Sequence, residues 1–170
     1  MVFRAMTRVL SILLVCTVCG CNPFAPRLER GDIGNLYGDP TTVDGFFTAF
    51  KTAYELRDVS LYEPLIDSSF TFEYYDYDAQ VERIWGFSRE LESTRRMFES
   101  AESIRLQWNQ ILVQDTLATS GYIRVVRSFN LTISLSADGF RGDGNVNFLL
   151  RREDDGAPWK LFRWRDESEF

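Results

Sequence analysis

The sequence contains no histidine among its 170 residues. Without an imidazole the chain cannot form a Ser-His-Asp or Cys-His catalytic group, a histidine-ligated zinc site or a histidine switch near neutral pH. Any general acid or base must therefore come from Asp, Glu, Tyr, Lys or Arg. We expect no cofactor and no metal ion, and the sequence identifies no catalytic residue.

Cysteine is also scarce, and the three residues Cys16, Cys19 and Cys21 lie together near the N-terminus. No disulfide can therefore cross-link the rest of the chain. A Cys-x-x-Cys-x-Cys metal cluster is one interpretation of this group, but metal ligation needs thiolates presented by a folded loop. These cysteines lie in a hydrophobic segment, which favours a role in export.

Basic residues are outnumbered, with 19 Lys and Arg against 25 Asp and Glu and a formal net charge of −6. A nucleic-acid partner is not expected, because binding to phosphates requires a basic surface. The apolar stretch from Val9 to Val18 covers about ten residues, whereas a membrane-spanning helix needs about 20. The stretch is therefore too short to span a bilayer.

Residues 1–20 have the organisation of a secretory signal, with Arg4 and Arg8 before the apolar stretch and small residues after it. Val18-Cys19-Gly20-Cys21 resembles the lipobox of bacterial lipoproteins. The resemblance implies cleavage after Gly20 and attachment of diacylglycerol and a further acyl chain, such as palmitate, to Cys21. Several acyl chains anchor a protein stably. A signal that is uncleaved, or cleaved without lipidation, is the alternative.

Asn22 follows Cys21 where an Asp would retain some lipoproteins in the inner membrane, so an outer-membrane location in the cell envelope is favoured. Residues 21–40 contain prolines and glycines without apolar periodicity, which predicts a tether. Residues 41–170 follow as one domain. The chain is 45% hydrophobic and 15% aromatic, so this domain can bury a core.

The first part of the domain has the apolar spacing of two helices followed by a strand. A helix is predicted from Val43 to about Leu56, with Thr42 as its N-cap. A short second helix, capped by Asp58, is limited by Pro64. The alternation of aromatic and polar residues over Ser68 to Tyr77 predicts a strand.

Residues 78–86 are predicted as a helical turn or a loop that carries Trp85 into the core. A third helix begins at Ser88. One side of this helix is lined by Leu91, Thr94, Arg95 and Phe98.

The second half of the domain alternates in the manner of strands. Ile104 to Trp108 form one strand, which continues through Ile111 and Val113 after a bulge that shifts the face. Gly121 to Asp166 is predicted as an antiparallel meander of three strands. Turn signals lie at Asp138-Gly139 and at Asp154-Asp155-Gly156.

The predicted order of elements is two helices, a strand, a helix and four strands. This order resembles that of the nuclear transport factor 2-like superfamily. The resemblance rests on the segments FFTAFKTAYELRDVSLYEPLIDSSFTF and WKLFRWRD. The segment IWGFSRELESTRRMF, together with the lipobox, is similar to bacterial lipoproteins of this fold. The resemblance implies a cystatin-like α+β fold, in which a curved mixed sheet forms a cone packed on three helices, with a pocket between the concave face and the first helix.

Such cones host steroid isomerases, polyketide cyclases, dehydratases and epoxide hydrolases, but also binding and dimerisation modules. The favoured function is a non-catalytic, membrane-anchored domain that binds a small apolar ligand or an envelope protein. One alternative is an isomerase- or hydrolase-type enzyme that uses Asp and Tyr on a small apolar substrate. The other is a structural module that forms a homodimer through its outer sheet face. Fold alone does not decide among them.

The residues predicted to line the pocket are mostly large aromatics, although most aromatics at such spacings belong to a core. The candidates are Tyr54, Phe72, Tyr74, Trp85, Trp108, Arg127, Phe129 and Trp164.

Arg127 interrupts an otherwise apolar strand face. Strict alternation would place its guanidinium on the concave side, where it could clamp a carboxylate. A bulge at Val125-Val126 would turn it outward, and we favour this arrangement because bulges are common in curved sheets. The acids nearest to the expected pocket are Asp67, Asp76 and Asp143, which match no catalytic motif. The spacing of Asp143 and its polar neighbours also matches no calcium loop.

Overall fold

The computed structural model describes residues 37–77, 79–117 and 121–166. The predicted signal, the predicted lipidation site Cys21 and most of the tether lie outside the described residues.

Three helices pack on one side of the molecule. Helix α3 (Val43–Leu56) begins at Thr42, whose hydroxyl accepts a hydrogen bond from the backbone N–H of Gly45 at 3.0 Å. The short helix α4 (Val59–Tyr62) and a 3-10 turn (Glu63–Leu65) follow, and helix α5 spans Phe87–Ser100. The predicted caps are present because Thr and Asp side chains can satisfy the free N–H groups of a first helical turn.

Six strands form one mixed sheet. Among the strands of the described residues only the β1–β6 pair is parallel, and the sheet order is β2-β1-β6-β5-β4-β3. The predicted α+β fold, with a mixed sheet packed on three helices, is therefore confirmed. The strands are β1 (Ile66–Asp76), β2 (Val81–Gly86), β3 (Ser103–Thr116), β4 (Tyr122–Ser134), β5 (Gly139–Arg151) and β6 (Lys160–Asp166).

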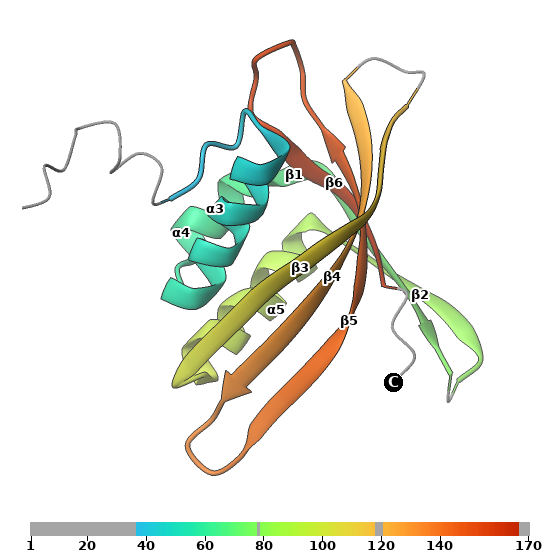
Figure 1. Ribbon diagram of the computed structural model, residues 1–170. Coiled ribbons are helices and arrows are strands. Elements are labelled where there is room, and N and C mark those ends of the chain that lie inside the picture. The colour runs from blue at the N-terminus through green and yellow to red at the C-terminus, as the bar shows by residue number, and fades with distance from the viewer. Residues whose placement is uncertain (1–36, 78, 118–120, 167–170) are drawn as a thin grey trace, which may run out of the picture.

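The sheet curves around the helices, and its concave face packs on them (Figure 1). The register of β3 against β4 shifts between Trp108 and Val113, as the predicted bulge requires. An extra residue on one strand bends the pair and increases its twist. The opposite side of β4 keeps an unbroken register with β5. The curvature at this edge therefore arises in β3.

The chain enters the domain through a close packing of backbone around Gly45. A Cβ atom at Gly45 would lie 1.9 Å from the carbonyl oxygen of Asp39, so only glycine fits there. The carbonyl of Pro40 accepts a hydrogen bond from the backbone N–H of Trp159 at 2.7 Å. These contacts join the end of the tether to the start of the last strand.

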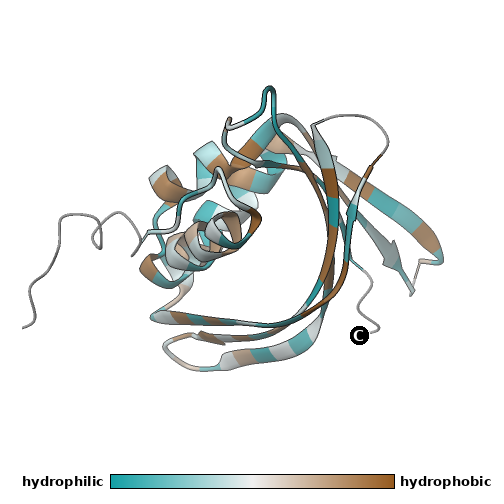
Figure 2. Cartoon of the chain, turned by 45° about the horizontal axis from the view of Figure 1, so that its top comes forward, coloured by the Kyte–Doolittle hydropathy of each residue, from teal (hydrophilic) through white to brown (hydrophobic). Residues whose placement is uncertain are grey.

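The interior between helices and sheet is apolar, as the brown bands along the strands indicate (Figure 2). The helix faces contribute Phe46, Phe47 and Phe50 from α3, each exposed by 1% or less. Phe148 and Leu161 meet them from the sheet and are both fully buried. One hydrophobic core therefore runs through the domain.

The prediction for residues 78–86 is wrong, because Val81 to Gly86 form strand β2, paired antiparallel with β1. Trp85 does pack against the core, where its ring stacks on Phe72 with centroids 4.2 Å apart. Strand β2 lies at the edge of the sheet and is largely exposed. The β1–β2 hairpin extends away from the helices (Figure 1).

Candidate functional site

The aromatic residues predicted to line a pocket lie within or against the packed interior, and Tyr74 also lines a hollow on the outer side of the sheet. Tyr54 and Phe72 are buried. Five others are partly buried and pack against the core: Tyr74, Trp85, Trp108, Phe129 and Trp164.

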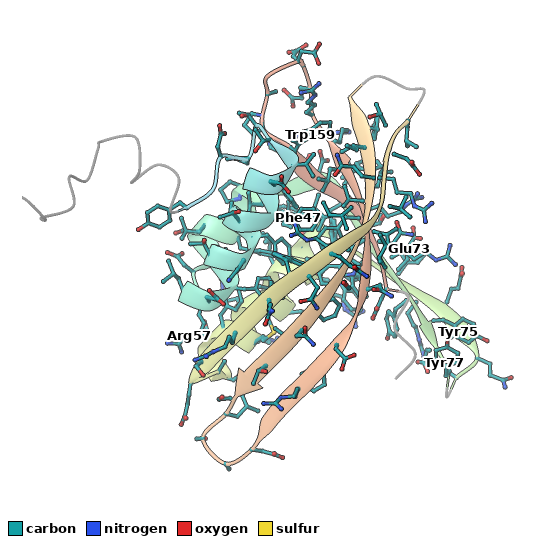
Figure 3. The ribbon with its side chains drawn as sticks, in the orientation of Figure 1. Phe47, Arg57, Glu73, Tyr75, Tyr77 and Trp159 are labelled. Atoms are coloured by element: carbon teal, nitrogen blue, oxygen red, sulfur yellow. The ribbon has the colours of Figure 1, made fainter. Side chains whose placement is uncertain are left out.

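These rings form a continuous series across the interior. Phe72 contacts Trp164, with centroids 5.0 Å apart, and Trp164 contacts Phe148 at 5.1 Å. Phe148 stacks on Phe47 at 5.7 Å, and Phe47 meets the edge of Trp108 at 4.9 Å. Figure 3 shows Phe47 between α3 and the sheet. These aromatic side chains form part of the hydrophobic core between the helices and the concave sheet face.

Arg127 points into the cone, so the favoured prediction of an outward side chain is wrong. Its guanidinium lies 4.9 Å from the centroid of Phe47 and 5.9 Å from that of Trp108. The Nε–H donates to the backbone carbonyl of Asn109 at 3.0 Å. Burial lowers the pKa of Arg127, and nearby Asp44 opposes this effect. The guanidinium covers the aromatic interior by cation–π contact.

A buried carboxylate lies on the other side of the interior. Glu90 of α5 is 4% exposed. The Tyr62 hydroxyl donates to its Oε1 at 2.8 Å, and the Trp85 indole N–H donates to its Oε2 at 2.8 Å. The Thr94 hydroxyl also donates to Oε1, at 3.2 Å. Both carboxylate oxygens are therefore engaged, which offsets the cost of burying a charge.

The predicted buried side of this helix includes Arg95 and omits Glu90. Arg95 is exposed. Glu90, Thr94 and Phe98 are four residues apart and therefore share one face of the helix. This spacing could have revealed the buried acid, but a charged residue beside Leu91 suggested a solvent-facing position.

Two tyrosines beside Glu90 are held in their neutral form. Burial, and then the negative charge of Glu90, raises the pKa of Tyr54 above its ordinary value. Burial likewise raises the pKa of Tyr62 well above that value. Neither tyrosine can supply a phenolate near neutral pH.

These shifts predict a loss of stability in alkali. Above about pH 10 the unfolded chain loses tyrosine protons that the folded protein keeps, so the free energy of unfolding falls as pH rises. Each buried tyrosine should contribute a slope of up to about 1.4 kcal/mol per pH unit. Urea unfolding between about pH 8 and about pH 11 measures it. Tyr54→Phe should reduce the slope and Tyr77→Phe, at a residue 56% exposed, should not. Equal slopes in all three proteins would contradict this assignment.

The three predicted acids do not face the aromatic interior together. Asp67 is buried and pairs with Arg151, whose Nη2 lies 2.7 Å from its Oδ2. Asp76 accepts from Arg83 at 3.3 Å. Asp143 is exposed on β5. Paired or solvated carboxylates of this kind have no arrangement for acid–base work on a shared substrate.

Two hollows lie side by side on the outer face of the sheet and share Glu73 and Arg165. The first, which we call the tyrosine pocket, has a volume of about 260 Å³. It is lined by Glu73, Tyr74, Tyr75, Tyr77, Glu82, Arg165 and Asp166. Figure 3 shows Glu73, Tyr75 and Tyr77 following the sheet onto the β1–β2 hairpin.

The second hollow, which we call the arginine pocket, has a volume of about 330 Å³. It draws on strands β1, β4, β5 and β6 and on Leu117, the residue that follows β3. It is lined by Glu73, Leu117, Arg124, Asn147, Leu149, Arg163 and Arg165.

No metal site is evident within the described part of the chain, where no group of three Cys, Asp or Glu side chains could hold an ion. None of the helices formed by residues 37–77, 79–117 and 121–166 is long and apolar enough to cross a bilayer.

No family model matches the sequence, and no curated protein is detectably similar to it. Solved structures are similar in fold. A nuclear transport factor 2-like protein of unknown function in nutrient uptake from Rhodospirillum rubrum superposes with a TM-score of 0.59 at 17% identity, covering 73% of this chain and 95% of that one. The domain has the nuclear transport factor 2-like fold.

Two further structures with this fold carry proposed activities. A proposed scytalone dehydratase from Novosphingobium aromaticivorans has a TM-score of 0.60 and 10% identity, and the match covers 72% of this chain and 78% of that one. A proposed dehydratase from the nuclear transport factor 2-like family of Streptomyces avermitilis has a TM-score of 0.56 and 17% identity, covering 72% and 90%. Identities this low establish the fold and leave the function open.

Proposed function

We propose that this protein is a lipid-anchored protein of the bacterial cell envelope whose nuclear transport factor 2-like domain binds a partner and does not transform it. The partner binds the outer side of the β1–β2 hairpin and the adjoining outer sheet face. The aromatic interior serves as the core that holds this surface in shape.

The observation that carries the proposal is the hydrogen bonding of the buried Glu90 carboxylate. A general acid or base must present a proton or a free lone pair to its substrate within hydrogen-bond reach. Three protein donors already occupy three of the about four acceptor positions of the Glu90 carboxylate. The rings of Phe47, Phe148 and Trp164 pack together in front of the concave sheet face. These features support a structural role for the buried acid.

Exposed apolar side chains on the hairpin support an external binding surface. Tyr75 and Tyr77 are 44% and 56% exposed, and Ile84, which shares the face of Tyr75, is 60% exposed. The rings of Tyr75 and Tyr77 meet edge to face at 4.9 Å. Large aromatic side chains that are held in place offer contact area at low entropic cost, and clusters of exposed apolar residues often mark interaction sites.

A cross-link experiment in cells tests the binding surface. A photoreactive amino acid at Tyr77 should give a cross-linked product with an envelope protein of defined mass. The same residue at Phe140, which is 49% exposed on the hairpin between β4 and β5, is the matched control. We expect a product at Tyr77 and none at Phe140. The same products at both sites, or none at Tyr77, would contradict an interaction surface on the β1–β2 hairpin.

The anchor gives a separate prediction. Cells fed a radioactive fatty acid should label the wild-type protein and leave Cys21→Ala unlabelled, because Cys21 is the proposed acylation site. Cys19→Ala keeps a small residue before Gly20 and should retain the label. Membrane fractionation should then place the labelled protein in the outer membrane. Label on Cys21→Ala would overturn the proposed site of acylation.

An isomerase- or hydrolase-type enzyme is the second candidate. Glu90 and Tyr62 lie together in the interior, which is the pairing such chemistry uses. The indole N–H of Trp164 is buried without an acceptor among the described residues, so a polar group of a ligand could approach it. Two of the structures with this fold are proposed dehydratases. This candidate requires the interior to open to a substrate.

A further inference from the structure

The arginine pocket concentrates positive charge in a chain whose formal net charge is −6. Three of its lining residues, Arg124, Arg163 and Arg165, are basic, and Glu73 is the one acid among the residues that line it. A cluster of guanidinium groups around a hollow on a rigid sheet is a recognition element for oxyanions, because each guanidinium presents several donors in a fixed plane.

The sheet register places these arginines on one face. Arg163 and Arg165 are two residues apart on β6, so both point to the same side at a spacing of about 7 Å. Leu149 pairs with Arg163 on one side and with Arg124 on the other. Arg124 therefore lies two strands from Arg163, about 10 Å away. Together the three side chains surround the apolar Leu149.

The arginines are poorly neutralised by the protein itself. The Nε–H of Arg124 donates to the uncharged amide oxygen of Asn147 at 3.1 Å. Arg165 reaches Glu82 at 3.8 Å, and both side chains are more than half exposed. Arg163 has no ion pair with any carboxylate of the described residues. An exposed pair at this distance contributes little, so the three guanidiniums of the lining outnumber its one acid, Glu73.

We infer that the arginine pocket binds the acidic side chains of an extended peptide segment of the partner. The inference rests on the proposed function and names the chemistry of the partner. In an extended chain, side chains two residues apart lie on one side at about 7 Å, which matches the spacing of Arg163 and Arg165. A segment with Asp or Glu at alternate positions would pair with both guanidiniums. A third acid, or the adjoining turn, would face Arg124.

A second copy of this chain fits the same surface less well. A two-fold contact centred on the pocket would set the patch against itself and bring its arginines together. Like charges in contact are unfavourable unless acids intervene. Glu73 is the single acid of the pocket lining.

Fluorescence anisotropy with the full acylated protein in detergent tests this inference. The probe is a labelled peptide, Asp-Ser-Asp-Ser-Asp, and the comparison peptides replace Asp with Asn or with Lys. We expect the Asp peptide to bind, the other two to fail, and the affinity to fall with added salt. Arg163→Gln/Arg165→Gln should weaken binding by about tenfold. Arg105→Gln/Arg141→Gln, with the same charge change at exposed residues outside the pocket, should leave it within about twofold.

Each other outcome counts against the inference. Equal binding by the two double variants, or binding of the Lys peptide, would show that the pocket does not select acids. A dimer in sedimentation that only the Arg163→Gln/Arg165→Gln change dissociates would assign this face to a second copy. If the peptide fails to bind while Tyr77 still cross-links to an envelope protein, this inference falls and the proposed function stands.

Discussion

Phe148→Ala is expected to lower the free energy of unfolding by about 4 kcal/mol, because it removes a fully buried ring from a closely packed interior. The ring of Phe148 has neighbours from both layers of the domain. Its centroid lies within 6.5 Å of those of Phe46, Phe47, Phe50, Trp108 and Trp164. No single neighbour can fill the space that alanine leaves.

Chemical denaturation measures the effect, and Phe140→Ala is the matched control. Phe140 is on the same strand but is 49% exposed, so its replacement should cost less than about 1 kcal/mol. The cavity in Phe148→Ala should also bind benzene, as dry cavities of engineered proteins do, whereas the wild-type interior should not. A loss of stability similar to that of Phe140→Ala would mean that the interior is already open.

Glu90→Leu is expected to lower the free energy of unfolding by about 3 kcal/mol. Leucine is apolar and similar in size, but it leaves the buried donors of Tyr62, Trp85 and Thr94 without their acceptor. Each buried donor without a partner costs about 1 kcal/mol or more. Glu90→Gln keeps one acceptor oxygen and should have an intermediate effect. Glu92→Leu, at an exposed residue of the same helix, should change stability by less than about 0.5 kcal/mol.

This series also separates the two candidate functions. Catalytic groups are often held at a cost to stability, so their replacement by a neutral residue is neutral or stabilising. A carboxylate with a structural role behaves in the opposite way. An increase in stability on Glu90→Leu would therefore favour the enzyme, and the predicted loss would favour the binding domain.

The helices could be predicted because their signals are local. Thr42 and Asp58 cap the first turns of α3 and α4 as their sequence positions indicate. Five apolar residues of α3 recur at three- and four-residue spacing and are buried in the core, namely Phe46, Phe47, Phe50, Ala53 and Tyr54. The β3 bulge could also be predicted, since the apolar face changes sides after Trp108.

Strand β2 could not be predicted, for a physical reason. It is an edge strand with both faces largely exposed, so its side chains show little alternation between apolar and polar. Its partner is set by the turn after β1 and by the packing of Trp85 on Phe72.

The positions of Arg127 and Glu90 depend on contacts between residues far apart in the chain, which a single sequence does not reveal. A bulge in either β3 or β4 can produce the same curvature, and the sequence did not say that only β3 carries one. Strict alternation of side chains along β4 therefore predicts the observed concave-side position of Arg127 correctly. Glu90 is buried because three donors from separate elements converge on it. That convergence is a property of the folded chain.

The central claim is that the interior admits no ligand. The indole N–H signals of the four tryptophans test this claim most directly. The N–H of Trp85 is bonded to Glu90, and that of Trp164 is buried among the aromatic rings. NMR spectra of the folded protein are recorded while benzene, indole or decanoate is added. We predict that the Trp85 and Trp164 signals stay in place for every ligand. A saturable shift of either signal would show that the interior admits a ligand and would contradict a binding domain that works through its outer face.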